Sequence, residues 1–125
     1  MYSAQTLDHF QAPRNAGEVS DPDAAVEIEN PACGDVLRLT LKFSFGRIAE
    51  IRFKAKGCVP AMACGSALTE IVSGKTLDEA RKLRRKDVIA AVGDLPQAST
   101  HAAQLALDAL FAALNQYHQA HQSSR

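Results

Sequence analysis

The chain has 125 residues, of which 46% are apolar and 22% charged, so we expect one compact globular domain, residues 1–125. Fourteen basic residues balance fourteen acidic ones, which makes nucleic acid or an anionic membrane an unexpected main partner. The N-terminus lacks the basic start and apolar core of a signal peptide, and no apolar run approaches a membrane span, so we expect a cytoplasmic protein. Three cysteines do not suit a disulfide framework, which leaves metal binding, thiol chemistry or burial.

The N-terminal half predicts one short helix and then strands. Residues 2–12 indicate a helix with Tyr2, Leu7 and Phe10 on an apolar side, and residues 25–29 alternate as a strand does. Two further alternating runs, joined by a short turn that contains glycine, predict a β-hairpin with one buried face. The apolar positions of the hairpin are Leu37, Leu39, Leu41, Phe43, Ala49, Ile51, Phe53 and Ala55.

The C-terminal half predicts helices that cover the apolar face of the hairpin. The first spans about residues 60–74, and the capping-box pattern of residues 76–79 starts a second. Residues 86–93 predict a short third helix, and residues 94–99 predict a loop after it. A long last helix begins near Ser99 or Thr100, and the tail, about residues 119–125, is expected to fray. Strands followed by helices predict an α+β fold, a small antiparallel sheet with helices on one face.

Candidate ligands lie at three junctions between these elements. Cys33 and Asp35 are in the turn before the hairpin, Cys58 follows its second strand, and His101 opens the last helix. Each also has a simple structural explanation: a turn residue for Cys33 or Asp35, a buried side chain for Cys58, a surface residue for His101. Cysteine, histidine and one carboxylate together suit zinc or iron–sulfur ligation.

Three other features have a structural explanation as their first interpretation. Cys64 lies inside the first covering helix beside small residues, where burial is the default, and five residues separate it from Cys58, unlike a CxxC redox pair. Gly65 costs about 1 kcal/mol against alanine in a helix, so we expect a close approach there. The basic residues within 81–86 are typical of a solvated face, with docking of an acidic partner as the alternative.

Five stretches occur in an order that resembles the IscU/NifU-type iron–sulfur cluster assembly scaffolds over roughly residues 2–117. They are LDHFQAPRNAG, NPACGDVLRL, RFKAKGC, GKTLDEA, and a late LP with a histidine before a long helix. The resemblance implies a three-stranded antiparallel sheet with helices on one face, and a scaffold rather than an enzyme. It implies that a [2Fe–2S] cluster forms from iron and from sulfur supplied by a cysteine desulfurase, and then passes to acceptor proteins.

The resemblance also implies which residues hold the cluster. Carried over by position, the ligands are Cys33, Asp35, Cys58 and His101, whereas the family's third cysteine falls on Ala102. The LPPVK stretch that an Hsp70-type chaperone recognises reads LPQAS here, at residues 95–99, which puts such handling in doubt.

Three functions follow in order of preference. The first is a working scaffold, with His101 or Cys64 supplying the missing coordination. The second is a binding protein that holds zinc or iron, or docks on the desulfurase, without assembling clusters efficiently. The third is a thiol sulfurtransferase that uses Cys33 or Cys58.

Overall fold

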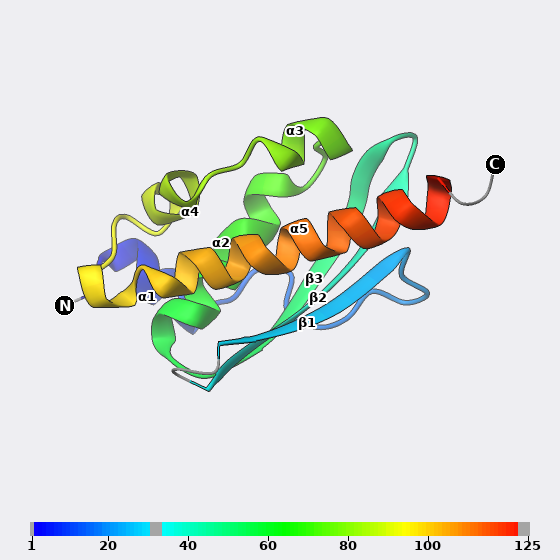
Figure 1. Cartoon of the computed structure of the whole chain (residues 1–125). Coiled ribbons are helices and arrows are strands. Elements are labelled where there is room, and N and C mark those ends of the chain that lie inside the picture. Colours follow the sequence, from blue (N-terminus) through cyan, green and yellow to red (C-terminus); the bar gives the residue numbers. More distant parts are fainter. Residues whose placement is uncertain (1, 31–33, 123–125) are drawn as a thin grey trace.

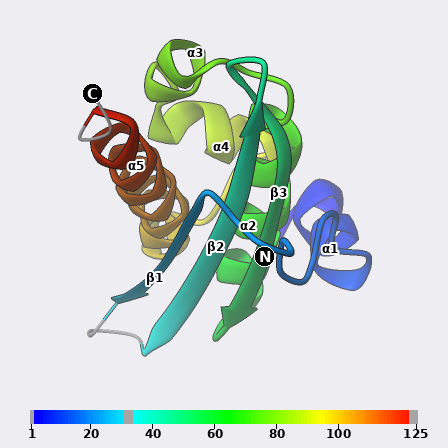
Figure 2. The same ribbon diagram turned by 90° about the vertical axis from the view of Figure 1, so that its right-hand side faces the viewer.

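The structure is a computed structural model that describes residues 2–30 and 34–122. A three-stranded antiparallel sheet has the order β1-β2-β3, with β1 at Ala24–Asn30, β2 at Asp35–Ser44 and β3 at Arg47–Lys56. The helices are α1 (Ala4–Gln11), α2 (Val59–Val72), α3 (Leu77–Arg81), α4 (Arg85–Ala91) and α5 (His101–Gln122). Helices α2 and α5 lie across one face of the sheet, as Figures 1 and 2 show, so the predicted α+β arrangement is confirmed.

The hairpin forms where the alternation predicted it, with one correction in its second strand. A register shift beside Lys42 and Phe43 pairs Phe43 with Ile48, so Ile48 is buried and Ala49, predicted on the buried face, is exposed. Leu39 pairs with Phe53 and Leu41 with Ile51, and all four side chains are buried on the helical side. Phe45 and Gly46 connect the strands with φ values of 54° and 76°, the left-handed pair that a two-residue hairpin turn requires. Along the other face, the Val19 amide donates to Thr40 Oγ1 (2.9 Å), so the loop after α1 lies against that side.

Helix α2 packs unusually close to the sheet because small residues fill its length. A side chain at Gly65 would place its Cβ 2.8 Å from Phe53 Cδ2 and 3.2 Å from Leu37 Cδ1, so the predicted close approach at this glycine is confirmed. Ten of the 14 residues in α2 are buried. Such a helix is enclosed on nearly all sides, and α1, α4 and α5 provide the cover beyond the sheet.

Helix α1 docks differently from the sequence-based prediction. Leu7, expected on its apolar side, is 40% exposed, and the buried residues are Thr6 and His9. The Thr6 hydroxyl donates to the Val92 carbonyl (2.8 Å), and His9 Nδ1 lies 2.7 Å from Ser66 Oγ. Buried polar residues such as Thr6 and His9 do not add to a hydrophobic periodicity in the sequence. The prediction that Leu7 lies on the buried side of α1 was therefore wrong.

The remaining helices follow the expected order. Thr76 and Glu79 form the predicted capping box of α3. Residues 97–99, expected as a loop, form one turn of 3-10 helix directly before α5. Helix α5 continues to Gln122, through most of the segment expected to fray, and residues 123–125 lie outside the described ranges. Within those ranges no helix has the length and apolar content that crossing a membrane requires.

Candidate metal centre

Three elements bring Asp35, Cys58 and His101 together. One ligand atom of each residue lies within 4.8 Å of those of the other two. The hairpin explains the first two, because Val36 pairs with Lys56 and so puts the start of β2 beside the end of β3. The first turn of α5 then supplies His101, at the end where all three elements meet.

Asp35 is the buried centre of this group, with 2% of its surface exposed. Its Oδ1 accepts the backbone N–H of Cys58 (3.1 Å), and its Oδ2 accepts the thiol of the same residue (3.2 Å). A buried carboxylate is costly without partners, and here two donors from one neighbouring residue satisfy it. The acidic side chain is therefore held in one orientation, toward Cys58.

His101 is oriented so that one ring nitrogen faces Asp35. Its Nδ1 lies 3.1 Å from the Ala98 carbonyl, which can only accept, so Nδ1 carries the hydrogen. In the neutral ring, Nε2 then holds the lone pair, 3.5 Å from Asp35 Oδ2. A backbone carbonyl that fixes the tautomer in this way is the usual second-shell contact of a metal-binding histidine.

The thiol of Cys58 is held in its protonated form. Burial raises the pKa of Cys58, and the hydrogen bond to Asp35 and the negative charge of Asp35 raise it further. A cation between the thiol and the carboxylate would offset both effects and favour the thiolate. Thiol, carboxylate and imidazole with a fixed tautomer fit zinc or iron by their chemistry.

Gly57 makes the contact between Asp35 and Cys58 possible. Its φ is +144°, and a Cβ built there would lie 2.0 Å from Asp35 Oδ1. Any side chain at this position would push the carboxylate away from the Cys58 amide. Sequence reasoning did not single out Gly57, and the only signal for it is its place directly before a candidate ligand.

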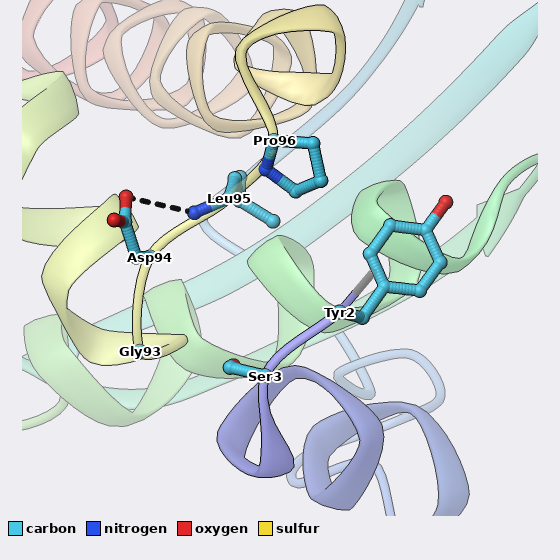
Figure 3. A pocket seen from close by; sticks show the side chains of 6 residues that line it. All are labelled: Tyr2, Ser3, Gly93, Asp94, Leu95 and Pro96. Atoms are coloured by element: carbon cyan, nitrogen blue, oxygen red, sulfur yellow. Dashed lines mark hydrogen bonds between the residues drawn. The ribbon is translucent and has the colours of Figure 1, made fainter.

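The group lines a hollow of about 310 Å³ that opens to the surface. Besides the three ligand residues, its lining includes Tyr2, Gly57, Pro60 and Ser99. Tyr2 also borders a second hollow of about 330 Å³ at Leu95 and Pro96, which Figure 3 shows with the Asp94 side chain accepting the Leu95 amide. The N-terminal residue Tyr2 and Ser99 of the 3-10 turn before α5 thus border the ligand group, and neither was predicted to line it.

The sequence matches the family model described as NifU-like N terminal domain over residues 1–124. The chain belongs to this family. It is 43% identical over 117 residues to "Iron-sulfur cluster assembly scaffold protein IscU 1" of Archaeoglobus fulgidus, covering 94% of this chain and 76% of the relative. It is 40% identical over 120 residues to IscU of Escherichia coli, a protein described by the same scaffold name, covering 93% of both.

Solved structures agree on the fold. The N-terminal part of a nitrogen-fixing NifU-like protein from Brucella abortus superposes with a TM-score of 0.79 at 18% identity, covering 94% of each chain. At this identity the likeness supports the fold alone. It agrees with the three-stranded sheet and helical layer described above.

The remaining candidate residues of this NifU-like domain are not part of the group formed by Asp35, Cys58 and His101. Cys33, carried over as the first cysteine, lies outside the described residues. Cys64 is fully buried in the hydrophobic core, where burial raises the pKa of its thiol to about 12. Ala102, in the first turn of α5, is also buried, with 1% of its surface exposed. The three described ligand residues are therefore brought together without Cys64.

Proposed function

We propose that this protein is an iron–sulfur cluster assembly scaffold. It assembles a [2Fe–2S] cluster from iron and from sulfur delivered by a cysteine desulfurase, and passes the cluster to acceptor proteins in the cytoplasm. The observation that carries the proposal is the convergence of Asp35, Cys58 and His101 from three elements at one open hollow. Membership of a family whose relatives carry the scaffold name supports the same function.

The proposed ligands are Cys33, Asp35, Cys58 and His101, and each has a separate role. Cysteine thiolates bind iron most firmly, so Cys58, with Cys33 from the preceding turn, provides the lasting attachment. Iron binding displaces the Cys58 proton, which Asp35 otherwise holds on the thiol. His101 offers Nε2 because Nδ1 is engaged with Ala98.

Asp35 has properties that suit a ligand of a cluster that must later be released. A carboxylate binds iron more weakly than a thiolate, and Asp35 has an alternative set of partners in the Cys58 amide and thiol. When the cargo leaves and the Cys58 sulfur takes up a proton from water, the carboxylate regains those two hydrogen bonds. We propose that this exchange lowers the cost of handing the cluster on.

Anaerobic reconstitution of the protein with ferrous iron, cysteine, a cysteine desulfurase and dithiothreitol as the reductant tests the proposal. We expect the visible absorption and Mössbauer spectrum of a [2Fe–2S] cluster, followed by its transfer to an apo-ferredoxin. Binding of one zinc or iron ion without cluster formation would instead support the metal-binding or desulfurase-docking alternative. A persulfide that forms on Cys33 or Cys58 without any metal requirement, and is passed to a small thiol, would support a sulfurtransferase.

A further inference from the structure

Five cationic side chains are concentrated in six consecutive residues that run from the last residue of α3 into the first turn of α4. Of the chain's 14 lysines and arginines, five lie within residues 81–86, although the net charge of the whole chain is zero. All five are exposed, and they are Arg81, Lys82, Arg84, Arg85 and Lys86. We call this stretch the basic segment.

The backbone of the basic segment is firmly held, which fixes the direction of its charges. Leu83, in the middle of the segment, is 9% exposed and packs into the core, and Ala80 and Val88 on either side are fully buried. Asp87 Oδ2 accepts a hydrogen bond from the backbone N–H of Arg84 (2.8 Å) and so caps the N-terminus of α4. Figure 1 shows the connection between the short helices α3 and α4, which residues 82–84 of the segment form. With Leu83 anchored inward, the charged neighbours point outward.

The basic segment differs in its pairing from five of the other lysines and arginines. Ion pairs with carboxylates involve five other cations, which are Arg14, Arg38, Lys42, Arg47 and Arg52. Among the described residues, no carboxylate forms an ion pair with any of the five cations of the segment. The five cations outnumber the neighbouring Asp78, Glu79 and Asp87, so the segment keeps a net positive charge that is available to a carboxylate from outside the chain.

A hollow with an aromatic wall adjoins the segment. Its volume is about 310 Å³, and Arg81, Phe111 and Asn115 line it. The Arg81 guanidinium donates to Asn115 Oδ1 (3.4 Å), so α3 and α5 form its two sides. Phe111 is only half-buried, which leaves apolar surface open beside the cations.

From the basic segment and this hollow together, we infer a docking surface for an acidic polypeptide segment. Its carboxylates would lie along residues 81–86, and one apolar side chain would enter the hollow against Phe111. Charge complementarity selects such a partner. The surface shares no residue with the hollow at Asp35, Cys58 and His101, so the partner would leave that site accessible.

A protein partner fits the surface better than a polyanion. Asp78, Glu79 and Asp87 flank the cations, and they would repel the phosphates of an extended nucleic acid on both sides. Carboxylates on a polypeptide can be spaced to avoid these acidic residues. The aromatic wall also suits an aliphatic side chain, which a phosphate backbone does not offer.

Fluorescence anisotropy with a labelled 18-residue helical peptide tests the inference. The peptide carries glutamates on one face and a single leucine at its centre, and two control peptides replace the glutamates by glutamine or the leucine by serine. We expect weaker binding by both controls. The triple variant Arg84→Gln, Arg85→Gln, Lys86→Gln should lower the affinity about tenfold or more, as should raising the salt from 50 to 300 mM.

The matched control removes the same charge elsewhere, in the triple variant Lys42→Gln, Lys54→Gln, Lys75→Gln. This variant should bind within about twofold of the wild type. Equal losses in the two triple variants would overturn the inference, because the peptide would then respond only to net charge. Absence of peptide binding would also overturn it, as would tighter binding of single-stranded RNA or phosphatidylglycerol vesicles that is lost in the first triple variant. Thermal unfolding of each variant, followed by circular dichroism, shows whether a loss of binding is due to unfolding of the protein.

Discussion

Asp35 and Cys58 are joined by two hydrogen bonds, one from the Cys58 amide to Oδ1 (3.1 Å) and one from its thiol to Oδ2 (3.2 Å). The carboxylate therefore controls both the position of the loop that carries Cys58 and the proton on its sulfur. These contacts link the fold to the proposed chemistry, because they hold a hard ligand, the Asp35 carboxylate, next to a soft ligand, the Cys58 sulfur. The hairpin register that aligns Val36 with Lys56 makes them possible.

The substitution Asp35→Asn should make Cys58 more reactive. Burial raises the pKa of Cys58 most, and the hydrogen bond to Asp35 and the charge of Asp35 raise it further. Removing the charge should lower the pKa, so that alkylation of Cys58 by iodoacetamide at pH 7.5 becomes several times faster. Mass spectrometry of the metal-free protein gives the rate for each cysteine. Cys64, with a pKa of about 12 in the core, provides the internal control and should stay unmodified.

The substitution Gly57→Ala should loosen the site by displacing Asp35. The new Cβ would meet Asp35 Oδ1 at 2.0 Å. We expect metal affinity to fall about tenfold to a hundredfold, because Asp35 is a proposed ligand and loses the orientation that its contacts with Cys58 give it. Competition with a chromogenic zinc chelator measures this affinity.

Gly46→Ala is the matched control, since Gly46 also has a positive φ (+76°) but nothing within 4 Å of its added Cβ. It should cost about 1–2 kcal/mol of stability from the strained backbone and leave the metal affinity unchanged. Equal affinity losses in the two variants would show that strain, rather than contact with Asp35, is responsible.

The docking of α1 should weaken as the pH falls. Burial lowers the pKa of His9 from 6.5, and Arg14 lowers it further, while Glu70 and Asp8 oppose this. Because the pKa of the folded state lies below that of the unfolded state, protonation favours unfolding. The contribution of neutral His9 is complete above pH 6.5 and is lost as the pH falls from there toward the lower pKa of the folded state.

Urea unfolding of the wild type and of His9→Gln between pH 8 and pH 5 measures this effect. The free energy of unfolding of the wild type should decline more steeply below pH 6.5 than that of the variant, because glutamine does not titrate. Parallel declines in the two proteins would assign the effect to other groups and refute the role of His9.

The substitution Ala102→Cys should improve cluster retention. The resemblance of the sequence implies that this alanine replaces the family's third cysteine, and it lies in the first turn of α5 next to His101. A thiol there would gain acidity from the helix N-terminus and add a firm ligand. We expect the half-life of the reconstituted cluster to lengthen severalfold when an iron chelator is present. Ala103→Cys, at an equally buried neighbouring position, should leave the half-life unchanged, and an equal gain there would contradict the assignment.

The sequence predicted those parts of the molecule that carry a periodic or capping signal. The alternation around Leu39 and Phe53 indicated the hairpin, and the Thr76–Glu79 pattern located the start of α3. Contacts between distant segments had no such signal. The His9–Ser66 contact and the fit of Gly57 against Asp35 depend on how α1 and the β3 end pack.

The position of Cys64 along α2 also did not predict where its side chain points, because α2 is buried on nearly all sides. In an amphipathic helix, the position of a cysteine on the apolar or polar face indicates whether it points inward. In α2 no polar face exists for comparison, so only the packed structure places Cys64 in the core.

Cluster reconstitution of Cys58→Ser and Cys64→Ala, side by side with the wild type, tests the central claim most directly. Both variants remove one thiol, but only Cys58 lies with Asp35 and His101. We predict that Cys58→Ser loses the [2Fe–2S] absorption almost completely, whereas Cys64→Ala retains the wild-type yield per folded protein. Full cluster formation in Cys58→Ser, or its loss in a folded Cys64→Ala, would contradict the account.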